Sequence, residues 1–337
     1  SFDPVERLCY PGRRGMGALE FEPSTGERRE QGGPVDIAPL VELANRVLAA
    51  REELTGVLQG DDDHHALQEI LRVGTSAGGA RAKAVLAWNE ETGQFHSGQL
   101  TAGPGYTQWL VKFDGVSGNA DKELADPMGF GRLEYACYLL AKEAGVTMAR
   151  SRLHEEGGRA HFMTQRFDRT ADGKKLHMQS LCAMRHFDFN QAKAYSYEQA
   201  IETIRMLGLG REAIREQVRR ALLNVFIRNQ DDHTKNIAFL MDSSGHWSLS
   251  PAYDVVYAYN PDGDWTNERQ MSLASKTDDF DLDDLLAFGK FADLKVHEIK
   301  SIISDILSAI SKWHELSLQA GVSPEMSAKA RSGFRSL

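Results

Sequence analysis

A polar loop held between two apolar patterns is the feature that most restricts the fold of this chain. The loop, Asn-Gln-Asp-Asp-His-Thr-Lys-Asn at 229–236, follows a helical apolar repeat at 217–228. The apolar run 237–241, typical of a strand, comes directly after it. Loops placed by two packed elements often carry chemistry. The pattern therefore predicts a helix, a functional loop and a strand in succession.

Within this loop, Asp231 and Asn236 are separated by four residues. The same spacing occurs in the catalytic loop of protein kinases, where the Asp orients the substrate hydroxyl and the Asn holds magnesium. Asp254 follows the strand-like residues 247–249, where a kinase has its second metal carboxylate. Asp and Asn also cap helices and make turns, which is the structural alternative for the loop taken alone. The downstream Asp254 favours the catalytic interpretation.

The motifs around the loop resemble the signature of the HipA-like serine/threonine kinases, the toxin components of HipA/HipB toxin–antitoxin pairs. They read Asn-x-Asp-Asp-His-x-Lys-Asn-x-x-Phe-Leu and, downstream, Ser-Pro-x-Tyr-Asp-Val-Val. The resemblance covers most of the chain, because further segments match in order: 12–18, 76–83, 110–112 and 165–169.

The composition changes from strand-rich to helix-rich near Asp168, which predicts an α+β, two-lobed, protein-kinase-like (HipA-like) fold. We expect a nucleotide-phosphate lobe over 1–168 and a helical catalytic lobe over 169–337. Family members usually carry additional strands before the segment that matches Gly12, so the resemblance implies that the first lobe is incomplete here or is completed by another chain. Strands are expected at 15–23, 84–88, 108–114, 149–153 and 160–167, and helices at 36–54, 66–73, 130–145, 197–207, 211–228, 280–291 and 296–321.

Residues 74–83 are rich in glycine and small side chains, so their backbone N–H groups can approach phosphate oxygens. A flexible lead into the next strand would have the same composition. The resemblance implies that Ser76 is autophosphorylated, which ejects the loop and switches the enzyme off. A phosphoryl group adds about two negative charges, which suits inhibition of a phosphate-binding loop. By the same resemblance, the nucleotide-phosphate loop comprises Gly78, Gly79, Ala80, Arg81, Ala82 and Lys83.

Lys112 stands in an apolar alternating strand and must reach an anion or water. Snorkelling at a sheet edge would satisfy it; beside the catalytic-loop motif, it resembles the strand lysine that holds nucleotide phosphates. Either Glu134 or Glu123 is a candidate partner for it. The resemblance adds a hinge whose backbone would bind adenine, at Gln165, Arg166 and Phe167, and further ATP-binding residues at His233, Lys235, Asn236, Tyr253 and Asp254.

Two charged segments have simpler interpretations. Asp-Asp-Asp-His-His at 61–65 resembles a cation site, but adjacent side chains diverge and an acidic start suits the positive end of a helix. Lys329, Arg331 and Arg335 are interpreted as a solvated basic tail.

Composition bounds location and partners. No apolar run is long enough to cross a bilayer, and Cys9, Cys137 and Cys182 form no C-x-x-C pair, so a reduced, cytoplasmic protein without structural zinc is expected. A formal net charge of -9 argues against coating nucleic acid. Some relatives touch operator DNA through a basic segment; the comparable stretch here, 275–284, is acidic, so we expect DNA contact only through an antitoxin.

The resulting hypothesis is an ATP- and Mg2+-dependent serine/threonine protein kinase. Asp231 would act as the base, and Asn236 and Asp254 would hold magnesium. The resemblance implies growth inhibition by phosphorylation of an aminoacyl-tRNA synthetase, such as the glutamyl enzyme, and neutralisation by a HipB-like DNA-binding antitoxin. No His-Arg-Asp precedes the base, and Val-Val rather than Phe-Gly follows Asp254, which puts ordinary activation-loop regulation in doubt. The alternatives are a small-molecule kinase of the aminoglycoside or choline type, and a non-catalytic kinase-like regulator.

Overall fold

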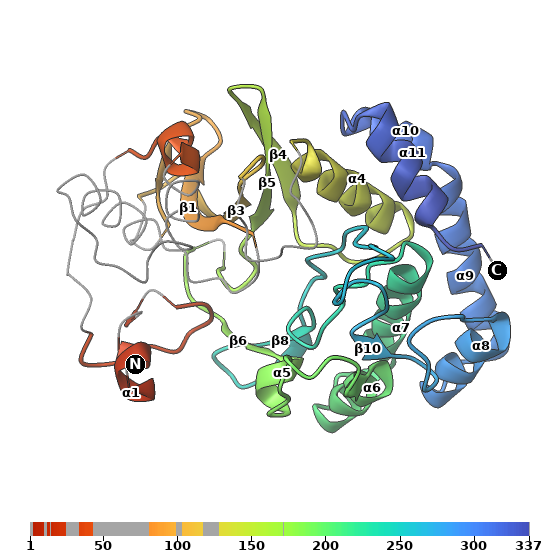
Figure 1. Cartoon of the computed structure of the whole chain (residues 1–337). Helices are drawn as coiled ribbons and strands as arrows, with labels where there is room; N and C mark the ends of the chain where they lie inside the picture. Colours follow the sequence, from red (N-terminus) through yellow and green to blue (C-terminus); the bar gives the residue numbers. More distant parts are fainter. Residues whose placement is uncertain are drawn as a thin grey trace. The chain divides into compact units, whose positions relative to one another are not determined.

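A computed structural model describes residues 3–9, 12–13, 15–24, 34–42, 81–98, 103–116, 128–170 and 172–336. The chain divides into two units (Figure 1). The first comprises Ser1–Gly131 and Arg152–His177, and the second comprises Arg132–Ser151 and Met178–Leu337. In the described residues, strands dominate the first unit and helices the second. No described helix combines the length and the apolar character that a membrane span requires.

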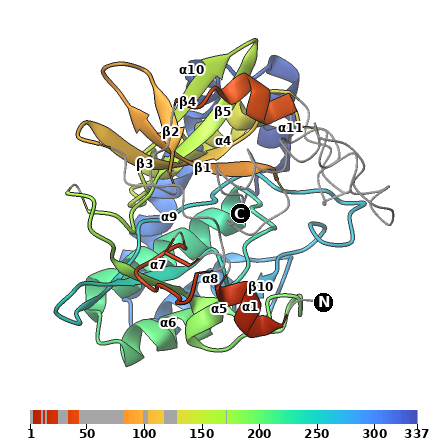
Figure 2. The same ribbon diagram turned by 90° about the vertical axis from the view of Figure 1, so that its left-hand side faces the viewer.

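The first unit is built on a five-stranded sheet with the order β2-β1-β3-β5-β4 (Figure 2). β1 pairs antiparallel with β2 and with β3, and β3 pairs antiparallel with β5. The central strand β3 places Trp109 opposite Leu86 of β1 and Gln165 of β5. The elements are α1 (Pro4–Cys9), β1 (Lys83–Asn89), β2 (Phe95–Ser97), β3 (Tyr106–Lys112), β4 (Ser151–Glu156) and β5 (Arg159–Gln165).

The core of this unit follows the predicted alternation. Trp109, Val111 and Phe113 are buried, as a period of two along a strand requires when one face is covered. Residues 37–42 are helical and bury Ile37 and Leu40 in the same cluster, which agrees with the described part of the helix expected at 36–54. Burial of each large apolar side chain stabilises the fold by about 1.5–3 kcal/mol.

The strand expected at 15–23 is wrong, because these residues form bends and irregular backbone. Their backbone groups bond to side chains instead of a neighbouring strand. Gly17 donates its N–H to Asp168 Oδ2 at 2.7 Å, and Arg169 Nη1 donates to Gly17 O at 3.2 Å. Lys175 Nζ donates to Arg13 O at 2.7 Å. These contacts occupy groups that a strand ladder would need.

The second unit contains most of the described helices. Capping residues in the sequence mark where several of them start. Ser196 and Gln199 form a capping box at the start of α6, and Asp281 and Asp284 form another at the start of α8. A three-stranded sheet, β6-β8-β9, lies in this unit, as does a parallel pair of β7 and β10. The elements are α4 (Phe130–Glu143), β6 (His177–Ser180), α5 (Leu181–Met184), β7 (Tyr195–Ser196), α6 (Tyr197–Met206), α7 (Gly210–Phe226), β8 (Ala238–Met241), β9 (Trp247–Leu249), β10 (Met271–Ser272), α8 (Leu282–Phe291), α9 (Val296–Ser311), α10 (Trp313–Gln319) and α11 (Pro324–Gly333).

Two expectations for the last residues are corrected. The single helix expected at 296–321 is divided into α9 and α10 at Lys312. The basic tail is not fully solvated either. Lys329 and Arg331 lie on α11, and Arg335 is largely buried in an ion pair with Asp278. A partner 57 residues away in sequence cannot be seen from local composition.

Candidate active site

The loop at 229–236 connects α7 to β8, as the sequence predicts, and it folds back on itself. His233 donates its backbone N–H to Asp231 O at 3.0 Å, and Asn236 Nδ2 donates to the same oxygen at 3.0 Å. The side chain of Asp231 is 43% exposed, whereas that of Asp232 is 1% exposed. Of the two neighbouring carboxylates, only Asp231 is therefore open to a substrate.

The carboxylate of Asp231 is held by an indole that sequence reasoning missed. Trp265 Nε1 donates to Asp231 Oδ1 at 2.8 Å, and His233 Nε2 lies 3.9 Å from the same oxygen. A tryptophan N–H generally needs an acceptor when the ring is covered. Trp265 is the sole tryptophan in the polar segment 259–270, which was the available signal. The bond fixes the orientation of the exposed carboxylate.

The segment that carries Asp254 is joined to the loop at two points. Asn229 Nδ2 donates to Asp254 O at 3.1 Å, and the Tyr253 hydroxyl donates to Lys235 O at 2.6 Å. Asp254 has a φ of 55°, and Arg228, at the entrance of the loop, has a φ of 49°. Left-handed backbone in residues other than glycine is strained and concentrates at functional sites. The structure thus brings the loop and Asp254 together.

Lys235 lies close to both carboxylates. Burial lowers the pKa of Lys235, while the Cys182 thiol, Asp231 and Asp254 act in the opposite direction. Its ammonium lies 3.3 Å from the centroid of the Phe189 ring. The arrangement places one positive charge beside two negative ones, as a site that handles phosphate and a metal requires.

His233 packs edge-on to the ring of Phe189, with centroids 6.2 Å apart. Its Nδ1 atom is buried and has no hydrogen-bond partner in the described part of the chain.

A buried ion pair between Asp232 and Arg269 holds the loop at 229–236 in place. Asp232 accepts from the Tyr197 hydroxyl at 2.8 Å and from the Gln270 backbone N–H at 3.2 Å, and it pairs with Arg269. Arg269 is fully buried. The network ties the loop to α6 and to residues 269–270, so Asp232 positions the loop. No local pattern in the sequence indicates Arg269 as the partner of Asp232.

The predicted metal ligands suit magnesium. Asn236 donates its Nδ2 to Asp231 O, which leaves its amide oxygen as the atom that could bind a metal. Magnesium prefers oxygen ligands and is usually held by one or two carboxylates together with water and phosphate oxygens. Within the described ranges, no group of three or more His, Cys, Asp or Glu residues forms a metal cage. These residues fit an ion that enters with a polyphosphate.

In the first unit, the predicted Lys112 lies directly opposite Lys83 across β3 and β1. Both lysines are buried, at 9% and 7% exposure, and Lys112 Nζ lies 5.9 Å from the Phe162 ring centroid. Residues opposite each other in an antiparallel pair share one face of the sheet, so the two lysines lie on the same face. Nearby in sequence, the Arg81 guanidinium lies over the Phe130 ring at 3.4 Å, and Ala82 packs against the apolar core.

The predicted hinge begins at Gln165, the last residue of β5. Arg166 donates its backbone N–H to Gln108 O at 2.8 Å, and its side chain bonds Asp168 at 2.9 and 2.7 Å. Burial alone would raise the pKa of Asp168, but Arg166, Arg169 and the Gly17 N–H together lower it. The Arg166 side chain therefore braces the chain after β5, and adenine binding by the backbone of Gln165 and Phe167 stays a prediction.

Several predicted residues lie outside the described residues. They are Ser76, Gly78, Gly79, Ala80, Glu123 and the segment 61–65. Glu134 is buried in α4. The choice between Glu134 and Glu123 as the partner of Lys112 therefore stays open.

An α+β chain with an Asp-x4-Asn loop joined to a downstream Asp belongs to the kinase-like class. The model of the family "HipA-like C-terminal domain" matches residues 75–314, and this chain belongs to that family. The recognition made from the sequence motifs is confirmed.

Two solved structures are similar. One is the complex of the Shewanella oneidensis MR-1 toxin–antitoxin system HipA, HipB and its operator DNA, with 19% identity, 96% of this chain and 74% of that chain covered, and a TM-score of 0.64. The other is a proinflammatory kinase, CtkA, from Helicobacter pylori, with 14% identity, 77% and 90% covered, and a TM-score of 0.44. The first likeness confirms the predicted HipA-like, kinase-like α+β fold.

Proposed function

We propose that this protein is a HipA-type kinase that transfers the γ-phosphoryl group of ATP to a serine or threonine of another protein. Family membership supports a HipA-type kinase in general. The observation that carries the proposal is the convergence of Asp231, Lys235 and Asp254, which the Tyr253 and Asn229 hydrogen bonds join into one site.

In this proposal, Asp231 orients the acceptor hydroxyl and receives its proton, while Trp265 keeps the carboxylate in place. Asn236 and Asp254 hold magnesium, which neutralises phosphate charge when bound. Lys235 and His233 face the transferred group. Catalysis then comes from positioning and from charge neutralisation rather than from covalent chemistry.

The strand-rich lobe, 1–168, contributes nucleotide-phosphate binding in this proposal, and the lobe 169–337 contributes catalysis. Lys112, with Lys83 opposite it, binds phosphate oxygens together with the loop 78–82. The hinge at 165–167 binds adenine through its backbone.

The proposed biological role follows the family. Phosphorylation of Ser76 switches the kinase off, a HipB-like antitoxin neutralises it, and the target is an aminoacyl-tRNA synthetase such as the glutamyl enzyme. The similar Shewanella protein was solved with HipB and operator DNA, which supports the antitoxin as a partner. Action in the cytoplasm, with DNA reached only through the antitoxin, belongs to the same proposal.

The test is transfer from radiolabelled ATP by the wild type and by Asp231→Asn. We expect the variant to lose transfer and to keep ATP binding, because the amide cannot accept the proton. Asp283→Asn, on the exposed first turn of α8, is the matched control. Mass spectrometry after incubation with ATP should find phosphate on Ser76 in the wild type only. Retained transfer by Asp231→Asn would remove Asp231 from the base role.

Acceptor choice separates the proposal from its alternatives. Labelling of glutamyl-tRNA synthetase, but not of an aminoglycoside or choline, is expected for the protein kinase. The opposite pattern would identify a small-molecule kinase. No binding of magnesium ATP in calorimetry would identify a non-catalytic regulator.

A further inference from the structure

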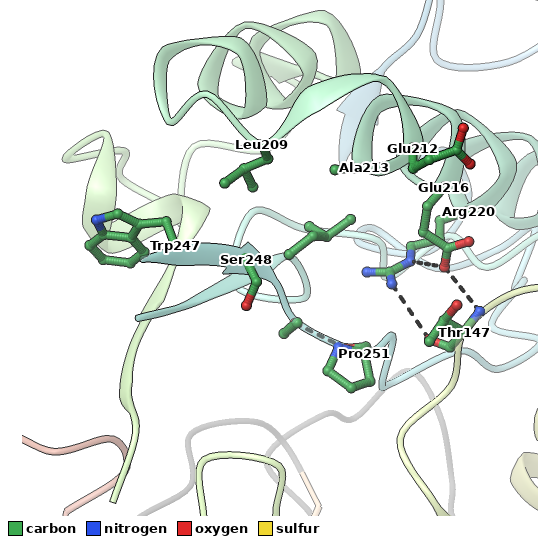
Figure 3. A pocket seen from close by; sticks show the side chains of 11 residues that line it. Thr147, Leu209, Glu212, Ala213, Glu216, Arg220, Trp247, Ser248 and Pro251 are labelled. Carbon is green, nitrogen blue, oxygen red and sulfur yellow. Dashed lines mark hydrogen bonds and ion pairs between the residues drawn. The ribbon is translucent and has the colours of Figure 1, made fainter. Parts of the chain in front are cut away.

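A cavity of about 330 Å³ lies in the second unit, and its lining includes none of the residues assigned to the active site. Figure 3 shows it between the first turns of α7, with Leu209 and Ala213, and the strand β9, with Trp247 and Ser248. We call it the α7–β9 groove. Its lining is Thr147, Leu209, Glu212, Ala213, Glu216, Arg220, Trp247, Ser248, Leu249, Ser250 and Pro251.

The groove has an apolar lining that the fold leaves partly uncovered. Leu209, Ala213, Trp247, Leu249 and Pro251 all line it, and each is only partly buried. Alternate residues of a strand point to opposite faces, and the Ser248 hydroxyl points away from α7 (Figure 3). An apolar side chain that entered from outside would bury this surface, which favours its binding.

The charge at the groove is selective for cations. Glu216 Oε1 accepts from Thr147 N–H at 3.0 Å and from Arg220 Nε at 2.8 Å, so Glu216 and Arg220 largely neutralise each other. Glu212 is exposed and forms no ion pair with a described residue. The remaining charge is negative, and it complements lysine or arginine.

The strand β9 is an edge of its sheet, whose order is β6-β8-β9. Ser250 N–H donates to Ala238 O at 2.9 Å, and Asp242 N–H donates to His246 O at 3.1 Å. Because antiparallel partners alternate, the N–H and C=O of Leu249 point away from β8. No described strand pairs with that side of β9. Such an edge is a template for an added strand.

We propose that the α7–β9 groove docks an extended, basic and apolar segment of the protein substrate. The segment pairs with Leu249 through its backbone, places alternate apolar side chains in the groove, and meets Glu212 with lysine or arginine. That the segment belongs to a protein substrate rests on the proposed kinase function. Its binding to the groove requires no ATP. Docking near the active site raises the local concentration of the substrate hydroxyl.

The probe is a short fluorescein-labelled peptide with a pair of arginines followed by leucines that alternate with serines. A matched peptide carries glutamates in place of the arginines. Fluorescence anisotropy should show binding of the arginine peptide, with about tenfold or greater weakening when the groove is filled by Ala213→Trp or its charge is reversed by Glu212→Lys. Leu318→Trp on α10 and Glu202→Lys on α6, both exposed, are the matched controls and should bind as the wild type does.

Glu212 is on the surface, so Glu212→Lys tests the proposal even if Ala213→Trp perturbs folding. Equal binding of the two peptides, or unchanged binding by both groove variants, would overturn the docking proposal. Labelling from ATP is measured in parallel. Peptide binding without any labelling would support the docking proposal and contradict the kinase proposal. Labelling without peptide binding would support the kinase proposal and contradict the docking proposal.

Discussion

Adjacent aspartates in the loop have different roles because their surroundings differ. Asp231 is exposed and held by one indole, whereas Asp232 is buried with Arg269 and Tyr197. A buried carboxylate with every oxygen engaged cannot exchange protons with a substrate readily. We therefore propose the functional role for Asp231, whereas its buried neighbour has a structural role.

The Trp265 bond to Asp231 yields a kinetic prediction. Trp265→Phe keeps the ring bulk but removes the N–H donor, so Asp231 samples more orientations. A hydrogen bond of this kind contributes about 0.5–1.5 kcal/mol, so we expect kcat for phosphoryl transfer to fall about two- to tenfold with ATP affinity unchanged. Steady-state kinetics with radiolabelled ATP measures it.

Trp313→Phe is the control for this change. Trp313 Nε1, on α10, donates to Ser327 O, on α11, at 3.0 Å, and neither residue is assigned to the active site. Trp313→Phe also removes one indole hydrogen bond, so it should lower the free energy of unfolding but leave kcat unchanged. A kcat for Trp265→Phe equal to that of the wild type would show that the indole bond does not position Asp231.

The buried His161 should make the free energy of unfolding depend on pH. Its Nδ1 accepts the Asp114 backbone N–H at 3.0 Å, which requires an unprotonated nitrogen. Burial, and then His154, lower the pKa of His161 to about 4 from 6.5. The unfolded chain takes up the proton first as pH falls, so this residue's contribution is present above pH 6.5 and is lost towards pH 4. The loss amounts to about 3 kcal/mol.

Urea unfolding at several pH values tests this dependence. His161→Asn offers an oxygen acceptor that does not titrate, so its unfolding free energy should vary less between pH 6.5 and 4. His314→Asn, at an exposed position on α10, should keep the wild-type slope. Parallel curves for the wild type and His161→Asn would contradict the assignment.

At the scale of elements, the Asp232–Arg269 pair holds the loop to residues 269–270, and the Tyr197 hydroxyl joins Asp232 to α6. Asp232→Ala would leave the guanidinium buried without its partner, so we expect a loss of about 3–5 kcal/mol in the free energy of unfolding. Adding Arg269→Met removes the stranded charge and should recover much of that loss. Glu22→Ala, in the exposed pair with Arg13, should change the free energy of unfolding little. A loss of similar size in the double variant would exclude charge burial as the cause.

Elements with local signals were predictable from the sequence. The helices at 197–207 and 211–228 correspond to α6 and α7, and the strand at 84–88 lies within β1, because periodicity and caps are written in neighbouring residues. The segment 15–23 failed because Asp168 and Arg169, far along the chain, bond its backbone. Local alternation carries no information about such partners.

The site divides in the same way. Asp231, Asn236 and Asp254 could be proposed from the sequence because kinase-type sites space these oxygen ligands in a recognisable order. Trp265 and Arg269 were not found, because an indole or a guanidinium acquires its role only from the carboxylate it meets in the fold.

At the scale of the whole molecule, the proposal assigns ATP-binding residues to each of the two units. Magnesium ATP should raise the midpoint of thermal unfolding, and ligand at about 100 times its Kd adds roughly 2.7 kcal/mol. Lys112→Met in the first unit and Asp254→Asn in the second should each remove most of this shift. Differential scanning fluorimetry with and without magnesium ATP measures both.

Lys290→Met, at an exposed position near the end of α8, is the control and should keep the full shift. If only one of the two site variants lost the shift, nucleotide binding would belong to a single unit.

Arg228, at the entrance of the loop, and Asp254, which the Asn229 hydrogen bond joins to it, both have left-handed backbones. Such a conformation costs about 1–2 kcal/mol in a residue with a Cβ atom, and glycine at 228 would relieve that cost. It would also release the entrance of the loop to move. Selection for stability to heat therefore favours glycine at position 228, whereas selection for fast turnover favours a residue that keeps the loop fixed. Evolution at this position can satisfy one of these requirements only at the expense of the other.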